Sequence, residues 1–82
     1  MKIEDVITLE NGKEYVILDI VMYENEKYLY CIGIDKEEKP TKEYIYLKGI
    51  EENGQFYIEE VDDEKVLKAI IALFTANYLA NE

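Results

Sequence analysis

Few residues in this sequence are arranged to perform chemistry, and the densest candidate is the acidic run from Glu59 to Glu64. A calcium-binding loop requires alternating oxygen ligands, a central glycine and a distal glutamate. This run has neither the alternation nor the glycine, and it coincides with the expected start of a helix. We therefore interpret its carboxylates mainly as helix-capping groups and predict no metal site.

Residues for nucleophilic catalysis are equally sparse. The chain has no histidine and no serine, so that Thr8, Thr41 and Thr75 have no imidazole to activate them. Carboxylate pairs occur throughout because 19 of the 82 residues are Asp or Glu, and a pair therefore does not mark a hydrolase site. The glycines follow no phosphate-loop spacing. We predict that the chain is not an enzyme and that it uses no cofactor.

The single cysteine, Cys31, lies in an apolar run and can form no disulfide within the chain. Cysteines in such runs are usually small core residues. We expect Cys31 to be a structural thiol that reacts slowly in the folded protein.

Tyrosine is the residue type that stands out, with eight copies and no tryptophan. Three of them lie close together in sequence, at Tyr23, Tyr28 and Tyr30. A tyrosine ring can pack against apolar surface while its hydroxyl stays hydrated, so tyrosine suits half-exposed sheets and protein interfaces. The expected role of these residues depends on the strands that position them.

Turn signals divide most of the chain into strands. Asn-Gly occurs at Asn11-Gly12 and Asn53-Gly54, and it favours a two-residue hairpin turn because both central residues must adopt positive φ. A third turn is expected at Asn25-Glu26. The predicted strands span residues 3–10, 13–23, 27–34, 43–50 and 55–60.

Two-residue turns fix which residues lie opposite each other in the predicted hairpins. Oppositely charged pairs then occur in each hairpin, which supports the registers. The key predicted pairs are Ile7 with Val16, Tyr23 with Tyr28, Ile20 with Cys31, Gly49 with Ile58, and Lys48 with Glu59.

The last segment changes period and predicts an amphipathic helix over residues 63–79. Asp62 is the expected N-cap, with Asp63 and Glu64 in the first turn, where the helix dipole favours anions. Val61 and Val66 are a candidate hydrophobic staple. The predicted fold is a single α+β domain over residues 1–82: a five-stranded, mainly antiparallel meander, open to strong curling, with one C-terminal helix packed on one face.

Side chains alternate between the two faces of each strand. One face collects aliphatic residues, and we expect the helix to cover it: Ile3, Ile7, Leu9, Val16, Leu18, Ile20, Met22, Leu29, Cys31, Ile45, Leu47, Phe56 and Ile58. The opposite face collects the tyrosines that form our candidate protein-interaction site: Tyr15, Tyr23, Tyr28, Tyr30, Tyr44, Tyr46 and Tyr57. These tyrosines could shield a solvent-facing sheet, form a second core if the sheet curls strongly, or contact another protein.

The net charge of −10 bears on the partners of this surface. Nucleic acid is normally bound by clustered cationic residues, so we expect no direct nucleic-acid binding. No apolar run approaches the length of a membrane span, and the charged N-terminus lacks a signal-peptide core, so we expect a cytoplasmic protein without membrane contact. We predict an interaction module for a protein partner or a second copy. The alternative is an acidic phage-type inhibitor, or nucleic-acid mimic, that blocks a basic groove.

Three stretches, LENGKEYVIL, YENEKYLY and IEEVDDEKVL, resemble the YrzB-like proteins, a group of small acidic bacterial proteins of unknown function. The resemblance extends from Ile7 to Phe74 and rests on strands, turns and an acidic helix start. It implies a bacterial or phage protein of the cytoplasm. It supplies no catalytic residues, and it leaves the function open.

Overall fold

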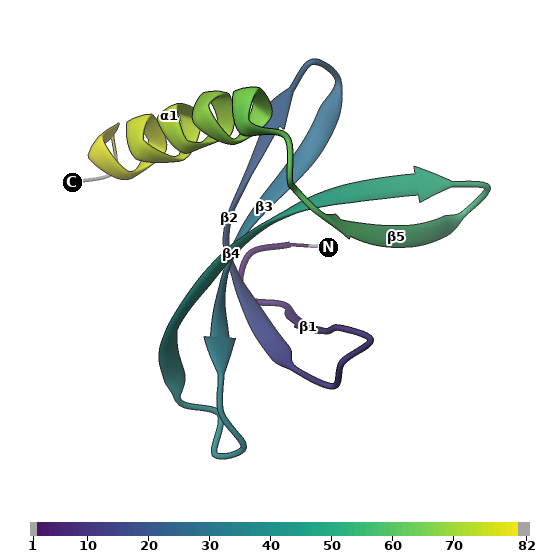
Figure 1. The fold of residues 1–82 in the computed structure, drawn as a ribbon, viewed down its shortest axis with the longest axis vertical. Helices are drawn as coiled ribbons and strands as arrows, with labels where there is room; N and C mark the ends of the chain where they lie inside the picture. Colours follow the sequence, from purple (N-terminus) through teal and green to yellow (C-terminus); the bar gives the residue numbers. More distant parts are fainter. Residues whose placement is uncertain (1, 81–82) are drawn as a thin grey trace.

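The computed structural model describes residues 2–80, which form one antiparallel sheet followed by one helix (Figure 1). The strands lie side by side in chain order, as a meander. This confirms the predicted α+β fold, with a sheet curled into a half-barrel. The elements are β1 (Val6–Thr8), β2 (Glu14–Tyr23), β3 (Glu26–Ile34), β4 (Pro40–Glu52), β5 (Gln55–Glu60) and α1 (Glu64–Ala80).

The β4–β5 hairpin forms as its sequence predicts. Asn53 and Gly54 both have positive φ, at 51° and 78°, as a two-residue type I′ turn requires. Gly49 therefore lies opposite Ile58, and Lys48 opposite Glu59, which confirms the predicted register.

The β1–β2 turn at Asn11-Gly12 differs from its prediction by one residue. Of these two residues only Gly12 has positive φ, and the Leu9 amide donates to the Lys13 carbonyl at 2.9 Å, which leaves a three-residue loop. The Asn11 side chain accepts the Lys13 amide at 2.9 Å and stabilises this form. Ile7 consequently lies opposite Tyr15 and not opposite Val16.

The β2–β3 turn lies one residue earlier than predicted. Glu24 and Asn25 carry the positive φ angles, so Tyr23 lies opposite Glu26, and the predicted pairing of Tyr23 with Tyr28 is wrong. The register changes by two residues, which is an even number. Near this turn the side chains therefore keep the faces that alternation assigns to them.

A β-bulge in the middle of β2 is the second irregularity. Ile17 lies opposite Cys31, whereas Asp19 lies opposite Tyr30, which leaves Leu18 as the extra residue. The three-residue β1–β2 loop exchanges the faces of the β2 residues that follow it, and the bulge exchanges them back. Tyr15 and Ile17 therefore face the same side as Cys31, while Val16 faces the other side, contrary to the predicted faces.

The concave face of the sheet forms an aliphatic core without the helix. The half-barrel is strongly curled (Figure 1), and the residues of its concave face form a hydrophobic cluster of their own. Ile20, Ile45 and Ile58 pack against this cluster from its margin. Its buried members are Ile7, Tyr15, Ile17, Leu29, Cys31 and Leu47.

The helix α1 packs on the convex face, so the prediction that it covers the aliphatic face is wrong. Its buried residues Ile70 and Phe74 join Val21 and Tyr28 in a second hydrophobic cluster. Figure 1 shows α1 lying alongside the ends of β2 and β3 that form their hairpin turn. The helix thereby buries its apolar stripe against tyrosines of the convex face.

The helix begins one residue later than expected. The Asp63 carboxylate accepts the backbone amides of Lys65 at 2.9 Å and Val66 at 3.4 Å, which makes Asp63 the N-cap in place of Asp62. Val61 and Val66 both pack at the margin of the second cluster. The chain thus enters the helix with apolar contacts on either side of its cap.

Cys31 is buried as predicted, but in the concave core and not beneath the helix. Its side chain has 0% exposure, and burial raises the pKa of its thiol to about 12. We expect the native protein at about pH 8 to react with an aromatic disulfide reagent at least about a hundredfold more slowly than the urea-unfolded protein. Absorbance of the released thiolate measures both rates. Equal rates would contradict this placement of the thiol.

Candidate protein-binding groove

Three tyrosines form a stacked row on the convex face of the sheet. Tyr30 on β3 lies opposite Tyr46 on β4, and their ring centroids are 5.1 Å apart with planes inclined by 19°. On its other side, Tyr30 stacks with Tyr44 at 5.7 Å and 14°. The period of two along β4 brings Tyr44 and Tyr46 to the same face, so that three rings adjoin across two strands.

The helix covers one end of this row. The ring of Phe74 lies 5.5 Å from Tyr30 and 5.8 Å from Tyr46, measured between centroids, in tilted orientations. Such geometry is favourable for aromatic pairs. Phe74 therefore fixes the helix to the sheet through two tyrosines.

The tyrosines near the helix behave as core residues. Burial raises the pKa of the Tyr28 hydroxyl, although the nearby Lys48 ammonium opposes the rise. Burial also raises the pKa of Tyr30, and the adjoining Tyr46 and Tyr44 hydroxyls raise it further. The raised pKa values reflect the packing of both rings in the second cluster.

Beyond the helix the same face is hollowed into a groove of about 510 Å³. It lies between the C-terminal half of α1 and the uncovered part of the sheet. A smaller hollow of about 190 Å³ adjoins it and shares Tyr30, Phe74 and Tyr78. We call the larger hollow the aromatic groove; its lining residues are Ile3, Leu18, Asp19, Tyr30, Tyr44, Phe74 and Tyr78.

One carboxylate stands among these apolar walls. Asp19 is half-buried, and its Oδ1 accepts the backbone amide of Ile20 at 2.9 Å. Its Oδ2 accepts a hydrogen bond from the Asn77 side-chain amide at 3.3 Å. The sheet and the helix thus hold the carboxylate in place from two directions.

The structure separates the seven tyrosines predicted to form one contact surface. Tyr23, Tyr28, Tyr30 and Tyr46 do share a face, but they lie against the helix and not opposite it. Of this set, only Tyr44 both lines the groove and is largely exposed, at 53%. Tyr57 is also exposed, but it lies on β5 within the β4–β5 hairpin, outside the groove.

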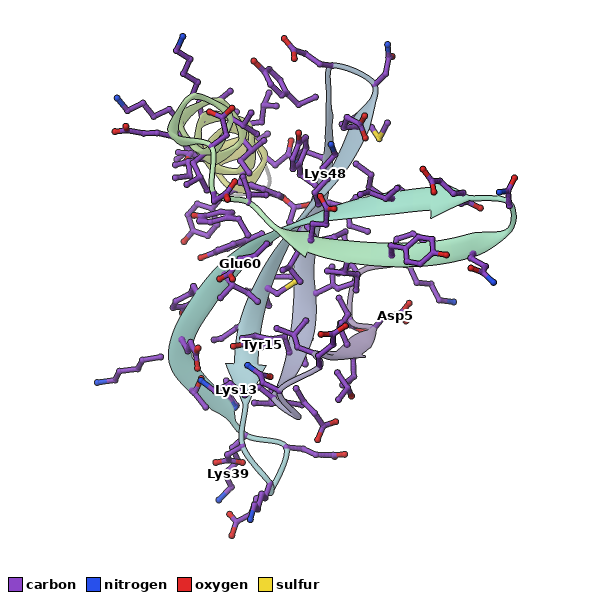
Figure 2. All side chains as sticks on the ribbon, turned by 45° about the vertical axis from the view of Figure 1, so that its right-hand side comes forward. Asp5, Lys13, Tyr15, Lys39, Lys48 and Glu60 are labelled. Atoms are coloured by element: carbon purple, nitrogen blue, oxygen red, sulfur yellow. The ribbon has the colours of Figure 1, made fainter. Side chains whose placement is uncertain are left out.

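Tyr15 lies on the opposite face from the other six, buried in the concave core. Its hydroxyl donates to Glu43 Oε1 at 2.9 Å, and Lys13 Nζ lies 3.4 Å from the same oxygen. Figure 2 shows Tyr15 and Lys13 toward the end of the sheet that lies away from α1. Gly33 lies opposite Tyr15, and an added Cβ there would approach the tyrosine ring to 3.4 Å. The closest approach of this added Cβ is to Thr41 Oγ1, at 2.9 Å, so the glycine alone does not identify Tyr15 as inward-facing.

Sequence reasoning missed several residues of the groove. Phe74 and Tyr78 were assigned to the helix, but the helix was expected on the other face. Leu18 and Ile3 were expected in the aliphatic core, yet both line the groove on the convex face. No sequence signal indicates that Asn77 on the helix would hold the carboxylate of Asp19.

The described residues provide neither a metal site nor a membrane-spanning helix. Among residues 2–80, no group of three or more His, Cys, Asp and Glu side chains is placed to hold a metal ion. The helix found within these residues is too short and too polar to cross a membrane.

The buried hydroxyl of Tyr15 should make the free energy of unfolding depend on pH in the alkaline range. Burial raises the pKa of its hydroxyl above the ordinary 10.0, and its bond to Glu43 raises it further. A raised pKa contributes stability below the unfolded value, and that contribution is lost as pH rises through the folded value. We expect Tyr15→Phe to cost about 1 kcal/mol at neutral pH and progressively less above about pH 10.

Urea unfolding of both proteins between about pH 7 and about pH 11 measures this difference, because the titrations that they share cancel. Glu43→Gln serves as the second variant, since it removes the carboxylate charge but keeps an acceptor for the hydroxyl. The free energy of unfolding of Glu43→Gln should fall less steeply above about pH 10 than that of wild type. A difference between wild type and Tyr15→Phe that stays constant with pH would contradict the assignment.

Comparisons of the chain with protein-family models, with curated proteins and with solved structures each returned no match. The resemblance to YrzB-like proteins therefore stays an expectation from the sequence.

Proposed function

We propose that this chain is a non-enzymatic interaction module that binds a partner protein through the aromatic groove. The observation that carries this proposal is the exposure of apolar side chains around one hollow. Tyr78 is 68% exposed, Tyr44 53%, Ile3 52% and Leu18 40%. Apolar patches of this kind on a small domain are typical of protein contact sites, in which tyrosine is enriched.

The uncovered part of the sheet extends this surface. A row of directly opposed residues crosses four strands on the convex face: Val6, Val16, Ile32 and Tyr44. Val6 is 54% exposed. Of the described residues of α1, only Phe74 and Tyr78 line the aromatic groove beside this row. An isolated solvent-facing sheet would carry more polar side chains in such a row. A docking partner would bury it.

Charge favours a foreign partner over a second copy. The chain carries a net charge of −10, so two copies repel each other, whereas a positively charged protein is attracted and its association is accelerated. We therefore propose a basic or locally basic protein of the same compartment, which the sequence predicts to be the cytoplasm, as the partner.

The first test removes the exposed aromatic rings. We expect the double substitution Tyr44→Ser and Tyr78→Ser to weaken binding at least about thirtyfold, because an aromatic anchor at an interface contributes about 2 kcal/mol or more. Immobilised wild-type chain first captures the partner from a lysate of the source cell. Calorimetry with the purified partner then measures affinity for wild type and variant.

Tyr57→Ser is the matched control, because Tyr57 is similarly exposed but lies away from the groove. It should bind as wild type does. Unfolding curves of all three proteins should agree within about 0.5 kcal/mol per substitution, since the changed rings lie on the surface. Unchanged affinity of the double variant would exclude the groove as the contact site, and sedimentation of the same proteins reports any self-association.

A second candidate function follows from charge alone. An acidic chain can occupy a basic groove on a target as a nucleic acid would, and the net charge of −10 favours this reading. The two functions differ in salt dependence. Groove-mediated binding should weaken less than about tenfold between about 50 mM and about 300 mM salt, whereas mimicry by many carboxylates should weaken by several powers of ten. Affinity measured across this range therefore decides between them.

A further inference from the structure

We infer that the aromatic groove is a receptor for an arginine side chain of the partner protein, whose guanidinium stacks on tyrosine rings and bonds to the Asp19 carboxylate. The inference rests on the proposed function and adds the chemistry of the anchor residue. It is carried by the combination of four aromatic rings with one fixed carboxylate in a single hollow.

The walls of the groove suit a cation. Tyr30, Tyr44, Phe74 and Tyr78 all line it, and the faces of aromatic rings attract cations placed within about 6 Å of their centroids. Tyr44 and Tyr78 are more than half exposed, so an entering side chain can reach their faces. The helix supplies one pair of rings and the sheet the other, which encloses the hollow from two sides.

The carboxylate suits a cation that can also donate hydrogen bonds. The Asp19 oxygens each accept one hydrogen bond within the chain, and a carboxylate can accept about four in all. Among the described residues that line the groove there is no lysine, so the negative charge is not neutralised there. An incoming guanidinium would supply both the missing charge and the missing donors.

The flat arrangement of rings favours arginine over lysine. Tyr30 and Tyr44 stack with planes only 14° apart, so the outer face of Tyr44 offers a platform parallel to the row. A guanidinium is planar, stacks on aromatic rings and bonds a carboxylate through two parallel donors, whereas an ammonium is a compact and strongly hydrated charge.

The occupant must come from another protein. The sequence contains no arginine, so a second copy of this chain cannot supply the anchor. The net negative charge of the chain also favours a basic foreign protein over a second copy. The anchor is therefore an arginine on an exposed segment of a foreign protein.

The test titrates the isotope-labelled full chain with N-acetyl-arginine methylamide and follows backbone amide resonances. We expect saturable shifts at Leu18, Asp19 and Tyr44, with a dissociation constant in the millimolar range for so small a probe. The citrulline analogue has nearly the same shape without the charge, and it should bind at least about tenfold more weakly. The lysine analogue should also bind more weakly than the arginine probe.

Asp19→Asn is the diagnostic variant, because its amide oxygen can still accept the Ile20 amide while the negative charge is lost. It should weaken binding of the arginine probe about tenfold, and Tyr44→Ser should weaken it severalfold. Tyr57→Ser should leave the titration unchanged. The amide spectra themselves report that each variant is folded.

Equal binding of the citrulline and arginine probes, shifts that map outside the groove, or an unchanged affinity of Asp19→Asn would each overturn the arginine assignment. Such a result leaves the proposed function to its own test, since a partner can still dock by apolar contacts that Tyr44→Ser and Tyr78→Ser disrupt. Conversely, the arginine assignment is supported if Asp19→Asn loses affinity for the arginine probe while Tyr57→Ser keeps the wild-type affinity.

Discussion

One extra residue in β2 determines the composition of both hydrophobic clusters. Side chains alternate strictly along a strand, so an insertion exchanges the faces of everything on one side of it. The three-residue loop before β2 makes such an exchange, and the bulge at Leu18 reverses it. Between the loop and the bulge, Tyr15 and Ile17 turn inward. After the bulge, Asp19 and Val21 face outward, as simple alternation predicts. Without this pair of irregularities, the concave core would lose its largest aromatic side chain.

The curled concave core in turn decides where the helix packs. A half-barrel brings its aliphatic side chains together from all five strands, which leaves no surface for a helix inside. The amphipathic stripe of α1 must then be buried on the convex face, against tyrosines whose rings are apolar enough to pack. Phe74 packs on the stacked pair Tyr30 and Tyr46, and the helix, which is narrower than the sheet, leaves Tyr44 beside it largely exposed. The groove thus arises because a single helix covers only part of a broad sheet face.

Much of this fold was accessible from the sequence, because the strands, the helix and one full register depend on local signals. Asn53-Gly54 adopts the predicted turn, whereas the identical dipeptide Asn11-Gly12 adopts another, since the Asn11 side chain there accepts a backbone amide. The bulge at Leu18 depends on non-local pairing and has no mark of its own in the sequence. The choice of face by the helix follows from sheet curvature, which alternation does not encode. Of the seven tyrosines predicted to form the contact surface, Tyr30 and Tyr44 line the groove, and its other members follow from the bulge and from the position of the helix.

The order of elements along the chain has a consequence for synthesis on the ribosome. In a meander each strand pairs with the one made just before it, so the sheet can assemble while translation continues. Phe74 and Ile70 emerge only afterwards, and until then the stacked tyrosines and open strand edges of the nascent sheet face solvent together. Most of the net charge of −10 lies in the strands and their turns and is present throughout that interval. Mutual repulsion between neighbouring nascent chains would keep these surfaces apart until the helix covers its half of the face.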